Sequence, residues 1–167
     1  MKYQSTRDNL KNKIESAQAI KQGLANDGGL FVPDAIPALS FDDIKALCPL
    51  SYPERAANIL SRYLTDYTYD ELLEDCKQAY CECSFPGGAA PLNKVTDTIY
   101  SLELWHGPTC AFKDLALQLL PYLLTTSAKK VFLNEKVQIL TTFYRNVCLS
   151  DTNYCKIYVC CMFTRYN

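Results

Sequence analysis

A long apolar segment that follows Gly107-Pro108-Thr109 constrains the fold of this chain more than any other feature. Glycine and proline just before a helix are typical of its start. The apolar residues after them recur at helical spacing and others fill in the opposite side, which predicts a buried helix. These residues are Phe112, Leu115, Ala116, Leu117, Leu119, Leu120, Leu123 and Leu124. Lys113 therefore lies in or near the first turn of a buried helix.

Lys113 can act as a nucleophile at that position. The positive end of the helix macrodipole disfavours an ammonium group, so the neutral amine is favoured. A neutral lysine amine is what Schiff-base chemistry with an aldehyde cofactor or a carbonyl substrate requires. The alternative from the local pattern alone is an ordinary solvated lysine. The neighbouring Asp114 either complements the charge of Lys113 or caps the first turn.

The rest of the chain predicts short strands and helices. We expect strands at residues 2–6, 30–32, 98–104 and 137–141, and helices at residues 14–22, 40–49, 52–63 and 68–80. The last two strands would be parallel if the helix between them is a crossover, which gives one βαβ unit. Residues 84–91 are rich in glycine and proline and predict a loop. We do not expect this loop to bind a phosphate, because the strand and helix that flank a phosphate-binding turn are absent here.

The charge of the chain excludes some functions. It has 167 residues, with 17 basic against 18 acidic side chains. This balance leaves no basic stripe, so we expect neither a nucleic-acid partner nor binding to an acidic membrane. The first residues contain charged side chains and no continuous apolar region, which argues against a secretory signal or a membrane span and makes the cytoplasm the expected location.

The nine cysteines raise the question of disulfides and metals. Without an export signal, we expect them to be reduced thiols. Cys76, Cys81 and Cys83 lack the paired spacing of structural zinc sites, and the single histidine, His106, lies elsewhere. We therefore expect no metal site.

Two segments of the chain resemble threonine synthases. Residues 102–114 (LELWHGPTCAFKD), with Gln118 four residues further on, resemble the cofactor-lysine signature of that family. Residues 3–7 (YQSTR) and 23–33 (GLANDGGLFVP) resemble its amino-terminal segment. The resemblance covers roughly residues 1–140 in the order that the family has.

The resemblance implies a pyridoxal 5'-phosphate enzyme of fold type II, which converts O-phospho-L-homoserine and water to L-threonine and phosphate. The lysine that matches Lys113 holds the cofactor as an internal aldimine and moves protons, so Lys113 is the one catalytic and cofactor-binding residue that we assign. Ser5, Thr6, Arg7 and His106 match family positions, but their roles stay open.

The implied fold is α/β. It has a small amino-terminal α+β domain at residues 1–83, followed at residues 84–142 by the start of the catalytic domain, which is an incomplete parallel sheet with flanking helices. Residues 143–167 form a tail that does not match the family. The sequence also departs from the family at Asp8, where glycine is usual, and at Trp105, where phenylalanine is common.

The resemblance stops abruptly after Thr142. The tail contains no glycine and is rich in tyrosine and cysteine, which is typical of a different reading frame, so we expect a truncated or frameshifted chain. A cofactor phosphate is normally held by the backbone amides of a glycine-rich turn, because glycine lets the backbone approach closely. No glycine follows Gly107, so we expect no such turn after the lysine motif. We therefore expect an inactive chain. The alternatives are a non-catalytic remnant or interaction module and a threonine-synthase-like phospho-lyase. The oligomeric state stays open.

Overall fold

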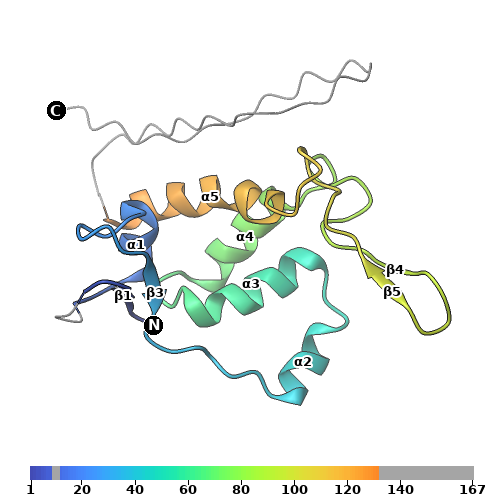
Figure 1. Ribbon diagram of the computed structural model, residues 1–167, viewed down its shortest axis with the longest axis horizontal. Coiled ribbons are helices and arrows are strands. Elements are labelled where there is room, and N and C mark those ends of the chain that lie inside the picture. Colours follow the sequence, from blue (N-terminus) through green and yellow to red (C-terminus); the bar gives the residue numbers. More distant parts are fainter. Residues whose placement is uncertain (9–11, 132–167) are drawn as a thin grey trace, which may run out of the picture. The chain divides into compact units, whose positions relative to one another are not determined.

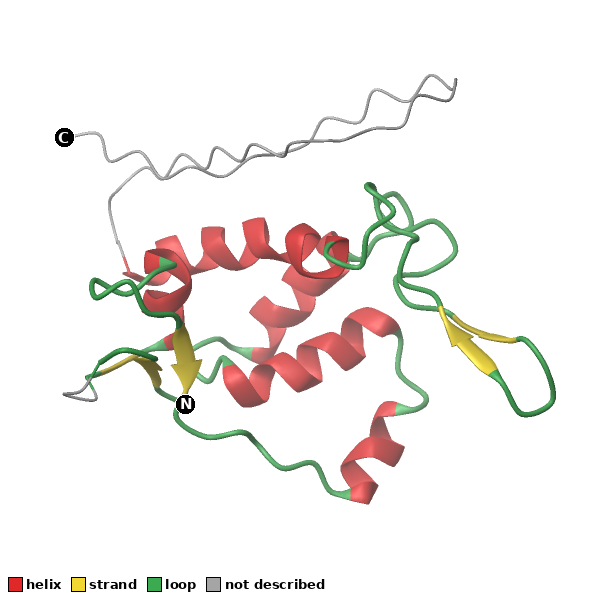
Figure 2. Cartoon of the chain, viewed as in Figure 1, coloured by secondary structure: helices red, strands yellow, loops and turns green. Residues whose placement is uncertain are grey.

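The computed structural model describes residues 1–8 and 12–131, all of which belong to the unit Met1–Leu133. Helices and short strands are mixed along this part of the chain (Figures 1 and 2). In chain order the elements are β1 (Tyr3–Ser5), β2 (Lys13–Ile14), α1 (Ser16–Gln22), β3 (Phe31–Pro33), α2 (Phe41–Leu47), α3 (Tyr52–Tyr63), α4 (Tyr69–Ala79), β4 (Leu92–Lys94), β5 (Tyr100–Leu102) and α5 (Asp114–Val131). The mixture confirms the predicted α/β class.

The first sheet is antiparallel, in the order β2-β1-β3, with Gln4 opposite Lys13 on one side and Val32 on the other. The strands predicted at residues 2–6 and 30–32 are confirmed as β1 and β3. The helix predicted at residues 14–22 begins later than expected: Ile14 belongs to β2, and α1 begins only at Ser16.

A carboxylate from far along the chain fixes where α1 begins. Asp66, in the link between α3 and α4, accepts a hydrogen bond from the backbone N–H of Ala17 at 2.8 Å and another from the Ser16 hydroxyl. The Ala17 N–H would otherwise be an orphan donor of the first helical turn. The helix therefore starts where Asp66 reaches it.

Local capping starts the next three helices, which the sequence predicts at residues 40–49, 52–63 and 68–80. In α2 and α4 the N-cap hydroxyls of Ser40 and Thr68 accept hydrogen bonds from the backbone three residues on. In α3 the Glu54 carboxylate accepts from the backbone N–H of Ser51 at 2.8 Å. Each reciprocal pair satisfies orphan N–H groups of a first turn, so each start is encoded within four residues.

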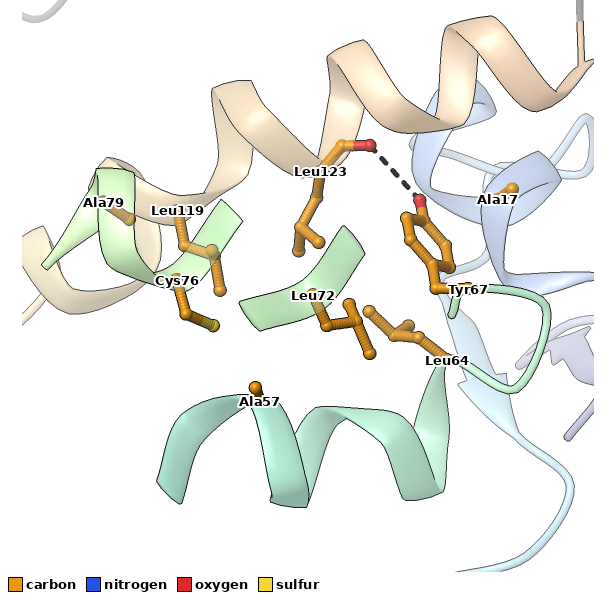
Figure 3. Close-up of a cluster of buried hydrophobic side chains, with 9 residues drawn as sticks. All are labelled: Ala17, Ala57, Leu64, Tyr67, Leu72, Cys76, Ala79, Leu119 and Leu123. Atoms are coloured by element: carbon orange, nitrogen blue, oxygen red, sulfur yellow. Dashed lines mark hydrogen bonds between the residues drawn. The ribbon is translucent and has the colours of Figure 1, made fainter. Parts of the chain in front are cut away.

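The core lies where α1, α3, α4 and α5 meet (Figure 3). Leu72 and Cys76 of α4 are fully buried between Ala57 of α3 and the side chains that α5 contributes, Leu119 and Leu123. Burial of these apolar side chains is the main favourable term in the stability of the unit.

Only one face of α5 is buried, which corrects the prediction of a helix buried on all sides. Leu119, Leu123 and Leu124 are buried, whereas Leu120 is 36% exposed and Phe112, just before the helix, is 65% exposed. Helices α1 and α4 pack on the buried face. Within the described residues no helix is both long enough and apolar enough to cross a membrane.

The strand predicted at residues 98–104 is confirmed as β5, but its partner was not predicted. It pairs antiparallel with β4, with Leu92 opposite Leu102 and Lys94 opposite Tyr100. Strand β4 has only three residues, too few to show a hydrophobic period. The strand expected at residues 137–141 lies outside the described residues, so the βαβ unit stays a prediction.

A buried tyrosine ties α5 to the link between α3 and α4. The hydroxyl of Tyr67 donates to the carbonyl oxygen of Leu123 at 3.2 Å, drawn as a dashed line in Figure 3, and is also hydrogen bonded to the Ser127 hydroxyl. Burial raises the pKa of Tyr67 to about 12. The phenol therefore stays neutral and keeps its proton for this contact.

The substitution Tyr67→Phe should lower the free energy of unfolding by about 1–3 kcal/mol, because it leaves the buried Ser127 hydroxyl without this partner. Urea denaturation of the whole chain measures the change. The matched control is Tyr100→Phe at a side chain that is 54% exposed, which should change stability by less than about 0.5 kcal/mol. Equal effects of the two substitutions would contradict the role given to Tyr67.

Candidate active site

Lys113 lies immediately before α5, as predicted. Its carbonyl oxygen accepts hydrogen bonds from the backbone N–H groups of Ala116 at 3.1 Å and Leu117 at 3.0 Å, so it starts the hydrogen-bonded ladder of the helix. Its side chain is exposed. The prediction of its place is therefore confirmed, but the buried surroundings expected for the amine are not found among the described residues.

The buried carboxylate of Asp114 closes the turn that carries Lys113. Asp114 is only 1% exposed, and its two oxygens accept from the Thr109 backbone N–H at 2.7 Å and from the Thr109 hydroxyl at 2.8 Å. Of the two roles considered for Asp114, the structure supports the bracing of the first turn. Residues 109–114 thus form a closed loop that ends at Asp114 and contains Lys113.

Gly107 is required by close packing against Asp114. A Cβ added at Gly107 would lie within 2.8 Å of the Asp114 Cγ atom, a distance that real side chains do not tolerate. Cys110, whose φ of 57° is unusual for a residue other than glycine, donates its backbone N–H to the Gly107 carbonyl at 3.1 Å. The turn therefore depends on glycine at 107 for space.

His106 connects the lysine motif to the loop at residues 84–91. Its Nε2 atom lies 2.7 Å from a carboxylate oxygen of Glu103, and its Nδ1 atom lies 3.1 Å from the Pro86 carbonyl oxygen. Both partners are acceptors, so the doubly protonated ring satisfies both contacts. The Glu103 carboxylate first and the Pro86 carbonyl second raise the pKa of His106, and the His106 ring lowers the pKa of Glu103.

The same loop is anchored on α4 by aromatic side chains. Phe85 is fully buried, with its ring centroid 5.8 Å from that of Tyr80. The Tyr80 hydroxyl donates to the carbonyl oxygen of Leu115 in α5 at 3.0 Å, and burial raises the pKa of Tyr80. The predicted loop is thus confirmed; it contacts the lysine motif through Pro86, and Tyr80 beside it contacts the first turn of α5. The sequence carries no signal for these contacts.

The amino-terminal motif forms its own interlocked turn. The Ser5 hydroxyl donates to the Asp27 carboxylate at 2.7 Å, and the Gly29 N–H donates to the same oxygen at 2.8 Å. These two hydrogen bonds, in that order, lower the pKa of Asp27. The Thr6 hydroxyl accepts from the backbone N–H of Leu30 at 3.1 Å. Ser5 and Thr6 therefore hold the turn of residues 27–29.

The two motifs do not meet in the described part of the chain. Figure 1 shows the first sheet and α1 beside the carboxyl-terminal end of α5, whereas Lys113 precedes its amino-terminal end. An 18-residue helix separates these ends by about 27 Å. Arg7, whose side chain is exposed and lies beside Gly28, is thus far from Lys113.

The cysteines differ from the prediction at one pair. Cys81 and Cys83 are joined by a disulfide, whereas Cys48, Cys76 and Cys110 are free thiols. The disulfide corrects the expectation that these two thiols are reduced. Their separation by one residue resembles neither a metal motif nor a long-range disulfide, so no sequence pattern predicts this bond. Within residues 1–8 and 12–131, no cluster of three or more side chains suited to a metal ion is found.

Comparison with known proteins gives a consistent match. The family model described as Threonine synthase N terminus matches residues 2–80. The threonine synthase of Schizosaccharomyces pombe is 41% identical over 120 residues, which are 71% of this chain and 23% of that protein. The threonine synthase of Escherichia coli is 37% identical over 136 residues, which are 80% of this chain and 30% of that protein.

Solved structures agree with the sequence matches. A pyridoxal-phosphate-bound threonine synthase from Brucella melitensis superposes with a TM-score of 0.69 at 34% identity, covering 78% of this chain and 28% of that one. The yeast threonine synthase gives a TM-score of 0.67 at 33% identity, covering 78% and 27%. The chain thus spans less than a third of the length of the relatives it matches.

The contact between His106 and Glu103 predicts how His106 titrates. A pKa raised above the usual 6.5 means that the stabilisation by this contact is complete below pH 6.5 and is lost as the pH rises through the raised value. The lowered pKa of Glu103 keeps its carboxylate charged to below pH 4.5. His106 is the only histidine, so its ring signals in an NMR titration are unambiguous.

We expect the titration midpoint of His106 to lie above 6.5 and to fall toward 6.5 in Glu103→Gln. The control Asp97→Asn, at a side chain that is 99% exposed, should leave the midpoint unchanged. A midpoint at or below 6.5 in the unmodified chain, or one that Glu103→Gln does not move, would contradict the geometry of the ring.

Proposed function

Because this chain belongs to the threonine synthase family, of which it spans the amino-terminal portion, we propose that Lys113 is the residue that carries pyridoxal 5'-phosphate. The observation that supports this most is the place of the amine, which is exposed at the start of α5 in a turn braced by Asp114. The match to the Escherichia coli enzyme spans 80% of the chain and so includes Lys113 wherever it begins.

The described residues fit only one end of this cofactor. A lysine amine is the partner that its aldehyde needs, and pyridoxal phosphate supplies an electron sink when bound. Its phosphate needs unpaired backbone amides. At the start of α5 the N–H groups of Asp114 and Ala116 already donate to Ala111 and Lys113. In the glycine loop, Gly87 N–H donates to Glu82 and Gly88 N–H to Phe85.

The reaction we propose for the family enzyme is the conversion of O-phospho-L-homoserine and water to L-threonine and phosphate. This chain contributes Lys113, which binds the cofactor, and two residues that orient the turn, Asp114 and His106. The described residues contain no binding site for the cofactor phosphate, so we propose that the chain alone is inactive. The same proposal includes two domains, an amino-terminal domain at residues 1–83 and the start of a catalytic domain at residues 84–142. It also includes a location in the cytoplasm.

The attachment site is tested by trapping. The whole chain is incubated with pyridoxal phosphate, reduced with borohydride and mapped by peptide mass spectrometry. We expect more label on Lys113 than on Lys129, because the positive end of α5 attracts the anionic cofactor to Lys113, whereas the negative end of the helix, where Lys129 lies, repels it. Equal labelling of these two exposed lysines at opposite ends of one helix would contradict the assignment.

The inactivity is tested by phosphate release. With added pyridoxal phosphate, the chain should release no more phosphate from O-phosphohomoserine than its Lys113→Ala variant does. The reason is that the described part of the chain lacks a binding site for the phosphate group of the cofactor. Release that is measurable in the unmodified chain and abolished by Lys113→Ala would show an active enzyme and overturn this part of the proposal, while supporting the role of Lys113.

A further inference from the structure

We propose that the Cys81–Cys83 disulfide is an exchange site for a low-molecular-weight thiol that carries a carboxylate. The disulfide lies in the wall of a cleft of about 440 Å³, which Lys77, Ser84 and Tyr122 also line. Lys113 is not among the described residues of this cleft. The site is therefore separate from the lysine turn and needs no cofactor.

The surroundings of the two sulfurs suit them to different roles. Cys83 is exposed and open to attack, whereas Cys81 is only half-exposed. The Ser84 hydroxyl oxygen lies 3.5 Å from Cys81 Sγ and 4.0 Å from Cys83 Sγ. A disulfide sulfur carries no proton, so the hydroxyl is the donor in this contact. It can donate equally to the thiolate that forms when the bond breaks, which favours Cys81 as the leaving group.

The exchange step needs only the incoming thiol. Its thiolate attacks Cys83 Sγ, a new S–S bond forms, and the bond between Cys83 and Cys81 breaks. The electron pair of the broken bond stays on Cys81, which takes up the proton that the incoming thiol lost. The products are a mixed disulfide on Cys83 and a free thiol on Cys81, with no further oxidant or reductant.

One lysine of the cleft can pair with an anionic thiol. Lys77 is the one cation among the described residues that line the cleft, and its charge also acts on the Glu54 carboxylate. Glu74 lines the cleft as well and accepts a hydrogen bond from the Gln78 amide at 2.7 Å. A carboxylate on the incoming thiol would find its oppositely charged partner in Lys77.

The other described cysteines do not share this chemistry. Cys76 is buried, and burial raises its pKa to about 12, so its thiolate is not formed. Cys48 and Cys110 are exposed but free, so a reduced thiol cannot attach to them without an oxidant. Attachment of a reduced thiol thus distinguishes Cys83 from these three.

The experiment treats the whole chain, purified without reductant, with reduced glutathione, and quenches it in acid with alkylation. Peptide mapping should show Cys81 linked to Cys83 before treatment, and glutathione on Cys83 after it. Cys83→Ser should abolish the adduct, whereas Cys48→Ser and Cys110→Ser should not. Lys77→Gln should slow the reaction with glutathione about two- to fivefold, as expected for one exposed charge pair, and leave the reaction with uncharged 2-mercaptoethanol unchanged.

Three results would overturn the proposal. One is a map in which Cys81 and Cys83 are not linked before treatment. A second is glutathione on Cys48 or Cys110 to the same extent as on Cys83. The third is a Lys77→Gln variant that reacts with glutathione at the unmodified rate, which would remove the preference for a carboxylate.

Discussion

The structure around the candidate site depends on one buried carboxylate. Asp114 accepts two hydrogen bonds from Thr109 and packs against Gly107, and it is also the first residue of α5. A buried carboxylate is costly unless donors satisfy it, so the turn of residues 109–113 is the arrangement that makes its burial possible. The place of Lys113 and the start of the helix that completes the core both follow from it.

Carboxylates fix other local geometries in the same way. Asp66 sets the first residue of α1 from a link 49 residues away, and Asp27 gathers Ser5 and Gly29 into one turn. The Glu103 carboxylate holds His106, which in turn reaches Pro86. Asp66 and Asp27 thus join segments that are far apart in the sequence, and His106 joins Glu103 to the distant Pro86. The apolar core packs the helices, while these carboxylates position the segments between them.

What the sequence could predict was local. Helices α2, α3 and α4 begin with signals contained in four residues, and Lys113 lies at its predicted place because a glycine-proline turn and an apolar period mark the start of α5. Other features depend on contacts between distant segments: the pairing of β2 with β1, the pairing of β4 with β5, and the exposed side of α5. The Cys81–Cys83 disulfide has a spacing that matches no known pattern. For the same reason, His106 was found as a motif residue but its partners, Glu103 and Pro86, were not.

Amide exchange at Thr109 tests the central role of Asp114 most directly. The backbone N–H of Thr109 donates to the Asp114 carboxylate, so it should exchange slowly with solvent in the folded chain and rapidly in Asp114→Ala. NMR-detected hydrogen exchange measures both rates, with an amide in the middle of α4 as the internal reference for global folding. Rapid exchange of Thr109 in the unmodified chain, or protection that survives Asp114→Ala, would contradict the account.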